Sequence, residues 1–140
     1  MQDCGVLAAA NSVVVGKTAV VLKPFTDVLK SPLSASHNLE NGTWTIQEDG
    51  LYQFTCNGTI ITGNDGGTVR LVLVGDVVVE MPLSSFYVNC GFKSQNSFNL
   101  SCVAICSAGS SFTWNANFAS VNAASTASVS IYTFNVLRLG

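Results

Sequence analysis

Apolar and polar residues alternate with a period of two through most of this chain, and no other feature constrains its fold as strongly. The alternation is clearest over residues 43–47, 98–106 and 112–118. Successive side chains of a β-strand point to opposite faces, so each segment predicts a strand with one apolar face. Val, Thr, Ile and Phe are abundant and helical periodicity is weak. About eight strands, spaced 8–12 residues apart, predict an antiparallel all-β sandwich.

The clearest hairpin joins Leu71–Val74 to Val77–Glu80 through Gly75 and Asp76. Glycine at the first central position of a two-residue loop suits a type II′ turn between β-branched runs. The segment that follows, Pro82–Asn96, is expected to form a loop.

With 140 residues the chain has the length of one domain, and we assign residues 13–140 to it. Residues 1–12 are expected to be a lead-in segment and Lys23–Leu39 a loop. Helical turns are expected only within Asp27–Lys30 and Ala119–Ala124. Without helices, the simplest cover for an apolar outer face is another copy of the chain.

Few residues are charged: Asp, Glu, Lys and Arg make up 10%, and the formal net charge is −2. Six scattered basic residues cannot bind nucleic acid through phosphate contacts, so no nucleic-acid partner is expected. No stretch approaches 18 uninterrupted apolar residues, so membrane insertion is not expected. The first residues lack the basic region of a secretion signal, so export would depend on lysis, assembly or a longer precursor.

The last strand, expected within Thr126–Leu139, is apolar on both faces when it is read as regular alternation. An antiparallel sandwich gives each sheet one wet face, so such a strand calls for a second cover. We therefore predict an obligate oligomer that buries upwards of ~2,000 Å² per interface. The alternative is a strand that lies in the middle of one core. The two apolar sets are Val129, Ile131, Leu137 and Leu139, and Tyr132, Phe134 and Val136.

An odd number of cysteines leaves at least one thiol free or paired between molecules. On one strand, Cys102 and Cys106 would share a face about 13 Å apart, too far for a disulfide or a shared metal ion. Buried thiols acting as small hydrophobic side chains are the simpler interpretation, and they favour folding in a reducing compartment. No metal and no cofactor are expected. The cysteines are Cys4, Cys56, Cys90, Cys102 and Cys106.

No catalytic motif stands out, and we expect that the protein is not an enzyme. His37 is the single histidine, and the residues near it show no nucleophile motif, so a loop histidine without a role is expected. Glu48, Asp49 and Asp65 are typical of turns before glycine, with a calcium site as the alternative. A carbohydrate-processing domain is the enzymatic alternative, and its cleft would need paired carboxylates from Asp65, Asp76 or Glu80.

Two expected loops carry the candidate binding residues. Pro82–Asn96 places aromatic rings and a lysine among Ser, Asn and Gly, a mixture typical of recognition surfaces. The alternative is that these rings pack under the loop or against a neighbouring subunit. Asn64–Gly67 is the second loop. The residues expected to bind a ligand are Phe86, Tyr87, Phe92, Lys93, Asn64 and Asp65.

The segment Gly42–Phe54, which reads GTWTIQEDGLYQF, resembles the signature of the complement-head and tumour-necrosis-factor-like jelly-roll family. That signature is a glycine, a large aromatic residue, a branched residue, a short turn and then Gly-Leu-Tyr-x-Phe. Residues 69–80, 98–118 and 128–139 resemble its later strands, so the likeness covers roughly residues 38–139.

The chain departs from the family pattern at two places. Ala108–Ser111 stands where the family has Gly-Asp after its glycine turn. Asn57-Gly58, a hairpin signal by itself, lies where the family continues a strand. Because Ile60–Gly67 offers a better reversal, we expect the strand to continue through Asn57 and Gly58.

The resemblance implies a homotrimeric jelly roll, here of about eight to ten strands, with inner-sheet aromatic residues packed on the threefold axis. Such heads often cap fibrous stalks and recognise receptors or surface glycans, and none is characteristically an enzyme. The residues that this resemblance and the apolar strands place at the trimer interface are Tyr132, Phe134, Val136, Tyr52 and Phe54.

These observations favour the head of a virus or phage spike or fibre, which binds a host receptor or a cell-surface glycan. Its partners would be two further copies and a fibrous stalk or capsid, and its place the virion surface or another extracellular surface. The free thiols, the missing secretion signal and the Ser-, Ala-, Asn- and Gly-rich composition favour this origin over a bacterial collagen-like filament. The alternative function is a trimerisation cap that binds no ligand.

Overall fold

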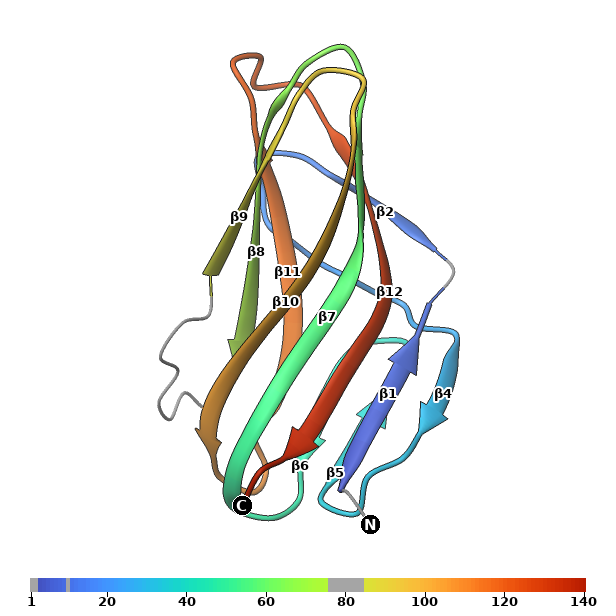
Figure 1. Cartoon of the computed structure of the whole chain (residues 1–140), viewed down its shortest axis with the longest axis vertical. Coiled ribbons are helices and arrows are strands. Elements are labelled where there is room, and N and C mark those ends of the chain that lie inside the picture. Colours follow the sequence, from blue (N-terminus) through green and yellow to red (C-terminus); the bar gives the residue numbers. More distant parts are fainter. Residues whose placement is uncertain (1–2, 10, 76–84) are drawn as a thin grey trace.

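Two antiparallel six-stranded sheets form the computed structural model, which describes residues 3–9, 11–75 and 85–140 (Figure 1). No helix occurs in this part of the chain, and so none that could span a membrane. Sheet A has the order β10 (Gln95–Cys106), β7 (Gly50–Thr62), β12 (Ala127–Arg138), β1 (Cys4–Ala8) and β4 (Asp27–Lys30), and β2 (Ser12–Val15) also pairs with β12. Sheet B has the order β5 (Ala35–Asn38), β6 (Thr43–Ile46), β11 (Ser111–Ala119), β8 (Gly67–Gly75) and β9 (Ser85–Cys90), and β3 (Val20–Val21) also pairs with β11.

The alternation seen in the sequence builds one core between the two sheets, and the predicted all-β sandwich is confirmed. In β11, every second residue from Phe112 to Phe118 is buried. The rings of Phe54 and Phe112 come from opposite sheets, and their centroids lie 4.6 Å apart. The Trp44 indole Nε1 donates a hydrogen bond to the Phe134 carbonyl at 3.0 Å. The largest fully buried side chains include Trp44, Trp114, Tyr52, Phe54, Phe112, Phe118 and Phe134.

A β-bulge in β12 decides where the two apolar sets of this strand point. Gly58 of β7 pairs with Ile131 and Asn57 pairs with Thr133, so Tyr132 is an extra residue. One extra residue shifts the alternation by one position. The buried residues are therefore odd-numbered before the bulge and even-numbered after it, so Val129, Ile131, Phe134 and Val136 face one core, while Tyr132 is exposed and Leu137 lines the outward side. The interpretation that both faces of this strand need a cover is wrong, and the alternative of a strand within one core is correct.

A glycine on the neighbouring strand gives this bulge its space. A Cβ atom on Gly58 would collide with the carbonyl oxygen of Ser130 and would come within 2.8 Å of the Phe98 ring. The backbone of β12 before the bulge thus lies directly against Gly58, and any side chain there would push the two strands apart.

Short strands form in several segments that were expected to be irregular. Cys4–Ala8, inside the expected lead-in 1–12, forms β1 and pairs with both β12 and β4. Asp27–Lys30, expected to be a helical turn in a loop, forms β4, and Ser85–Cys90 forms β9. Neighbouring strands supply the hydrogen bonds of these segments, so their own composition does not identify them.

The expected turns have different outcomes. Strand β7 continues through Asn57 and Gly58, as expected. In Ala119–Ala124, the first residue ends β11 and the others lie in a loop rather than the expected helical turn. Most of the expected hairpin around Gly75-Asp76, including Val77–Glu80, lies outside the described residues.

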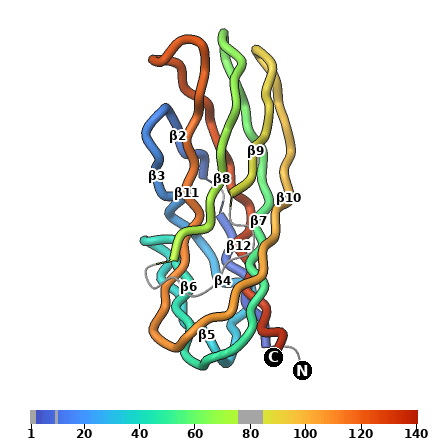
Figure 2. The backbone as a smooth tube through the Cα atoms, turned by 90° about the vertical axis from the view of Figure 1, so that its left-hand side faces the viewer, coloured from blue at the N-terminus to red at the C-terminus, as the bar shows by residue number. Residues whose placement is uncertain are grey.

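Both chain ends lie at one end of the sandwich, and three loops lie at the other (Figures 1 and 2). These loops join β7 to β8, β9 to β10 and β11 to β12, and they stand at the top of both views. A head held through either terminus would present them outward. We call residues 63–66, 91–94 and 120–126 the apical loops.

Candidate recognition surfaces

The first two apical loops are joined by a dense set of hydrogen bonds. The Lys93 amide donates to the Gly63 carbonyl at 2.6 Å. The Thr62 hydroxyl donates to the Gly91 carbonyl at 2.6 Å and accepts a hydrogen bond from the Ser94 amide at 3.0 Å. The turn from residue 91 to 94 is therefore fixed to the end of β7.

The third apical loop is tied to the first. The Ser120 hydroxyl donates to the Gly66 carbonyl at 2.8 Å. The Asp65 carboxylate accepts hydrogen bonds from the Ser125 hydroxyl and from the Asn122 amide, the latter at 3.5 Å. The single carboxylate of the apical loops is thus used to hold the loops together.

Phe92 and Lys93 are presented at the tip of this assembly. The Phe92 side chain is 70% exposed. Lys93 is also exposed and has a φ of 46°, in the left-handed region that side-chain-bearing residues seldom adopt. Hydrogen bonds already fix the backbone of this turn. A ligand that contacts the phenyl ring and the ammonium group would therefore cost the turn little backbone entropy. Val121, on the third loop, is fully exposed.

The structure divides the residues predicted to bind a ligand. Tyr87 is exposed on β9 and points outward from sheet B. Phe86 is half-buried, and its ring centroid lies 6.0 Å from that of Trp114, which matches the alternative that a ring packs on the core. The apical loops bring together the other four residues, Asn64, Asp65, Phe92 and Lys93.

Four strands of sheet A lack charge almost entirely. Arg138 is the single charged residue in β1, β7, β10 and β12, and it pairs with Glu48 at 2.6 Å beyond the end of the strand. We call the outward residues of these four strands the neutral face. Its exposed large side chains are Leu51, Ile61, Ile105 and Tyr132.

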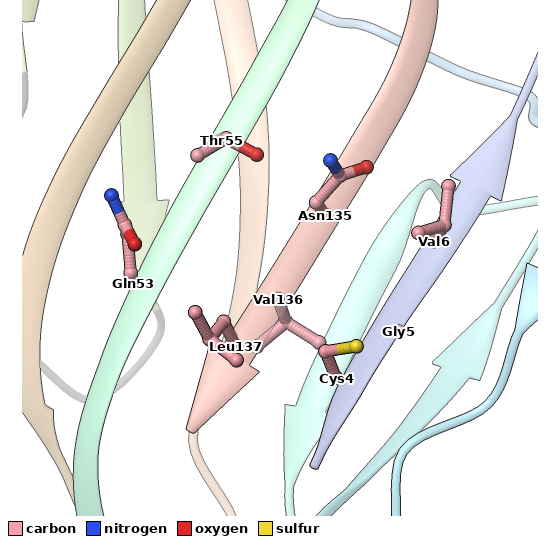
Figure 3. A pocket seen from close by; sticks show the side chains of 8 residues that line it. All are labelled: Cys4, Gly5, Val6, Gln53, Thr55, Asn135, Val136 and Leu137. Atoms are coloured by element: carbon pink, nitrogen blue, oxygen red, sulfur yellow. The ribbon is translucent and has the colours of Figure 1, made fainter. Parts of the chain in front are cut away.

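A shallow groove of about 260 Å³ crosses the neutral face (Figure 3). It runs over β7, β12 and β1, and its lining is apolar or uncharged and polar. Sequence reasoning did not find this groove, because it depends on strands 50 and more residues apart that pair in sheet A. Its lining includes Cys4, Val6, Gln53, Thr55, Asn135 and Leu137.

The expected trimer-interface residues need a correction. Tyr52, Phe54, Phe134 and Val136 are buried in the core of a single chain, so they cannot contact a neighbouring chain. Tyr132 is exposed on the neutral face, and its hydroxyl lies 3.0 Å from that of Thr59. The bulge explains this separation, because it turns Tyr132 outward and returns the following apolar residues to the core.

All five cysteines are free, and four of them are buried. Burial raises the pKa of Cys102 and of Cys106 to about 11 and shifts that of Cys56 higher still. Burial disfavours the thiolate, so these groups are inert small side chains at neutral pH, as expected. In the described part of the chain, no group of three or more His, Cys, Asp or Glu side chains is placed to hold a metal ion.

The carboxylates expected in turns form an ion pair and hydrogen bonds that connect neighbouring segments of the fold. Glu48 pairs with Arg138, and Asp49 accepts a hydrogen bond from the Ala108 amide at 2.8 Å. Asp65 bonds within the apical loops. Glu48 and Asp49 share the turn between β6 and β7, whereas Asp65 lies beyond the other end of β7, so the three carboxylates do not line one cleft.

The residues considered for catalysis are not assembled into a site. His37 is exposed on β5 in sheet B, with its ring edge-on to Trp44 at 5.9 Å between centroids. Asp27, near it in sequence, lies on β4 in sheet A. Asp76 and Glu80 lie outside the described residues.

The sequence matches no protein-family model, and no curated protein matches it. Solved structures do. The globular domain of the zebrafish complement 1qA protein has a TM-score of 0.71 and 15% identity, over 100% of this chain and 98% of that one. The fold is a complement-head and tumour-necrosis-factor-like jelly roll.

Two further structures support the same fold. Eiger TNF from S. frugiperda has a TM-score of 0.70 and 11% identity, over 99% of this chain and 93% of that one. Murine APRIL at pH 5.0 has a TM-score of 0.71 and 10% identity, over 99% of this chain and 100% of that one. At these identities the likeness is one of fold, and functions differ widely within a fold.

Proposed function

We propose that this chain is a non-enzymatic recognition head that assembles into a homotrimer through its neutral face and binds a receptor or glycan at a cell surface through its apical loops. Its place would be the tip of a virus or phage spike or fibre. Free buried thiols suit a protein that folds in a reducing cytoplasm before assembly. The trimer is what the family resemblance implies.

The observation that carries this proposal is the arrangement of the apical loops. Three loops far apart in sequence are joined by hydrogen bonds, and they present Phe92 and Lys93 at the end opposite both termini. Exposed aromatic and cationic side chains on a fixed backbone are the usual anchors of a binding surface.

The neutral face supports self-association. Monomeric proteins rarely expose contiguous apolar patches, and association surfaces are depleted of charge in their centre. The neutral face has the second property, since no unpaired charge lies on its strands, and Ile105 and Tyr132 add about half-exposed apolar side chains to it. A second chain would cover these side chains and fill the groove beside Leu137.

Replacement of an apical anchor tests the proposed binding. The assembled protein would be labelled and applied to a panel of cell types and to a glycan array. Phe92→Ala is expected to lower apparent affinity at least ten-fold, as truncation of a central aromatic anchor does. The matched control is Leu33→Ala, which shortens another exposed apolar side chain, at the opposite end of the sandwich beside Asp3.

Unchanged binding of Phe92→Ala, or equal losses in both variants, would contradict the assignment of binding to the apical loops. A protein that binds no cell and no glycan would favour a second candidate function, a trimerisation cap on a fibre. The adjacent termini suit such a cap as well, since a stalk would join the head at one end.

A further inference from the structure

The outward face of sheet B differs from the neutral face, because it carries one unpaired cation among uncharged polar groups. Arg70 is the only charged residue in β8, β9 and β11. It forms no salt bridge with any described residue. Its Nη2 donates a hydrogen bond to the Ser85 hydroxyl at 3.0 Å. This bond orients the guanidinium group and leaves most of its N–H donors open to a ligand.

Two neighbouring rows of side chains surround this cation. In the first row, the ladder places Asn117 and Tyr87 on either side of Arg70. In the second row, Val72 lies beside Asn115. Cross-strand neighbours on one face have Cβ atoms about 4.5–5.5 Å apart, so the two rows form one continuous platform. A shallow groove of about 90 Å³ runs over it, lined by residues of β8, β11 and the Ala19 segment.

The chemistry of this platform fits an acidic sugar. A guanidinium fork holds a carboxylate through two parallel hydrogen bonds. The amides of Asn115 and Asn117 both donate and accept, as adjacent sugar hydroxyls require. Val72 and the Tyr87 ring, which is 66% exposed, offer apolar surface to the C–H face of a sugar. We propose that the outward face of sheet B binds a carboxylated saccharide at this groove, as a site separate from the apical loops.

Other ligands fit this platform less well. A nucleic acid needs several cations for its phosphates, whereas Arg70 is alone on these strands. A second protein chain would bury the unpaired Arg70, whereas no unpaired charge lies on the strands of the neutral face. A shallow groove binds one sugar weakly, and a homotrimer would raise the avidity by presenting three grooves together. Only in this last respect does the inference rest on the proposed function.

Immobilised 3′-sialyllactose, 3′-sulfolactose and lactose test the site with the assembled protein. Wild type is expected to bind 3′-sialyllactose most strongly. Arg70→Gln should lower the apparent affinity at least ten-fold, and Arg70→Lys should give an intermediate loss because it keeps the charge without the fork. The matched control is Lys30→Gln, which removes the same charge from an exposed residue of β4 and should bind as wild type does.

Several results would overturn the inference: binding of Arg70→Gln equal to wild type, an equal loss in Lys30→Gln, or equal binding of lactose. Stronger, Arg70-dependent binding of 3′-sulfolactose would contradict the carboxylate assignment. Loss of sugar binding in Phe92→Ala but not in Arg70→Gln would move the glycan to the apical loops, which overturns this inference and supports the proposed function. Loss in Arg70→Gln alone supports this inference, whatever Phe92→Ala does to cell binding.

Discussion

The two sheets resemble each other on their inward faces and differ on their outward ones. Both supply aromatic rings to the core, such as Phe54 from sheet A and Trp114 from sheet B. Outward, strands β1, β7, β10 and β12 of sheet A present uncharged side chains such as Ile105 and Tyr132, while β8, β9 and β11 of sheet B present Arg70 among uncharged ones. The core requires only that inward residues be apolar and fit together. The outward residues are free of that requirement, so their difference supports the two proposals made above: another chain on sheet A and a saccharide on sheet B.

The largest expected effect is the contrast between two single-residue deletions, one in a central strand of each sheet. In β12, deletion of Tyr132 removes the bulge, joins Ile131 to Thr133 and leaves Phe134 and Val136 in the core. The cost is the loss of the Tyr132 hydrogen bonds, roughly 1–2 kcal/mol of unfolding free energy. Urea denaturation followed by tryptophan fluorescence measures it.

The matched deletion in sheet B should unfold the protein. In β11, loss of Asn115 turns either Phe112 and Trp114 or the residues after them out of the core. Removal of one large aromatic side chain from a core costs about 3–5 kcal/mol, and a domain has only about 5–15 kcal/mol in total. If the deletion of Tyr132 unfolds the chain as fully as the deletion of Asn115, the bulge does not have the role assigned here.

This bulge also shows how far the sequence could predict the fold. Alternation identified the long strands, and the Gly42–Phe54 signature identified the jelly roll, because both depend on local order. One extra residue between Ile131 and Thr133 leaves no signal in the sequence around it. It exchanges the inward and outward faces for every later residue of β12, so the faces predicted for those residues were wrong. The signal that could have found it is Gly58 in the partner strand, whose meaning depends on a pairing distant in sequence.

The candidate sites were predicted in part for the same reason. Phe92 and Lys93 can be recognised from the sequence alone, because they are an aromatic and a cationic residue among small ones. They lie in a loop, as expected. Phe86 and Tyr87 were assigned to that loop, but pairing with β8 makes them part of a strand and turns them to opposite faces. Arg70 gave no signal of its own, because its isolation on sheet B appears only when three strands are placed side by side.

The next largest effect comes from placing a charge on each outward face in turn, at a tyrosine, and comparing how the two variants assemble. Tyr132→Glu places a carboxylate on the neutral face of every copy, and Tyr87→Glu places one on sheet B. A buried, unpaired charge costs about 3–5 kcal/mol, so association of Tyr132→Glu should weaken by a factor of at least about 100. Tyr87→Glu should assemble as wild type does. Sedimentation velocity at micromolar concentration distinguishes these outcomes, with wild type at three times the 14.7 kDa chain mass.

Wild type that sediments as a monomer would remove the proposed trimer. Assembly lost in Tyr87→Glu and kept in Tyr132→Glu would reverse the assignment of the two faces. Circular dichroism should show both variants folded, since both side chains are well exposed in the single chain.

The smallest expected effect is on the loss of stability at alkaline pH, compared between an inward and an outward thiol of sheet A. The pKa of Cys106 is raised by burial from 9.0 to about 11, so the folded state favours its neutral form. Its contribution to stability is therefore complete below pH 9 and is lost as the pH rises toward 11, by on the order of 1 kcal/mol at pH 10. Cys106→Ala should flatten the decline of the urea midpoint between pH 8 and pH 10, measured under reducing conditions. Cys4→Ala removes a thiol from the neutral face instead, so it should leave the decline as it is in wild type. An equal decline in all three proteins would mean that other alkaline titrations control the loss, such as those of Cys56, Cys102 and Tyr52, whose pKa values burial also raises.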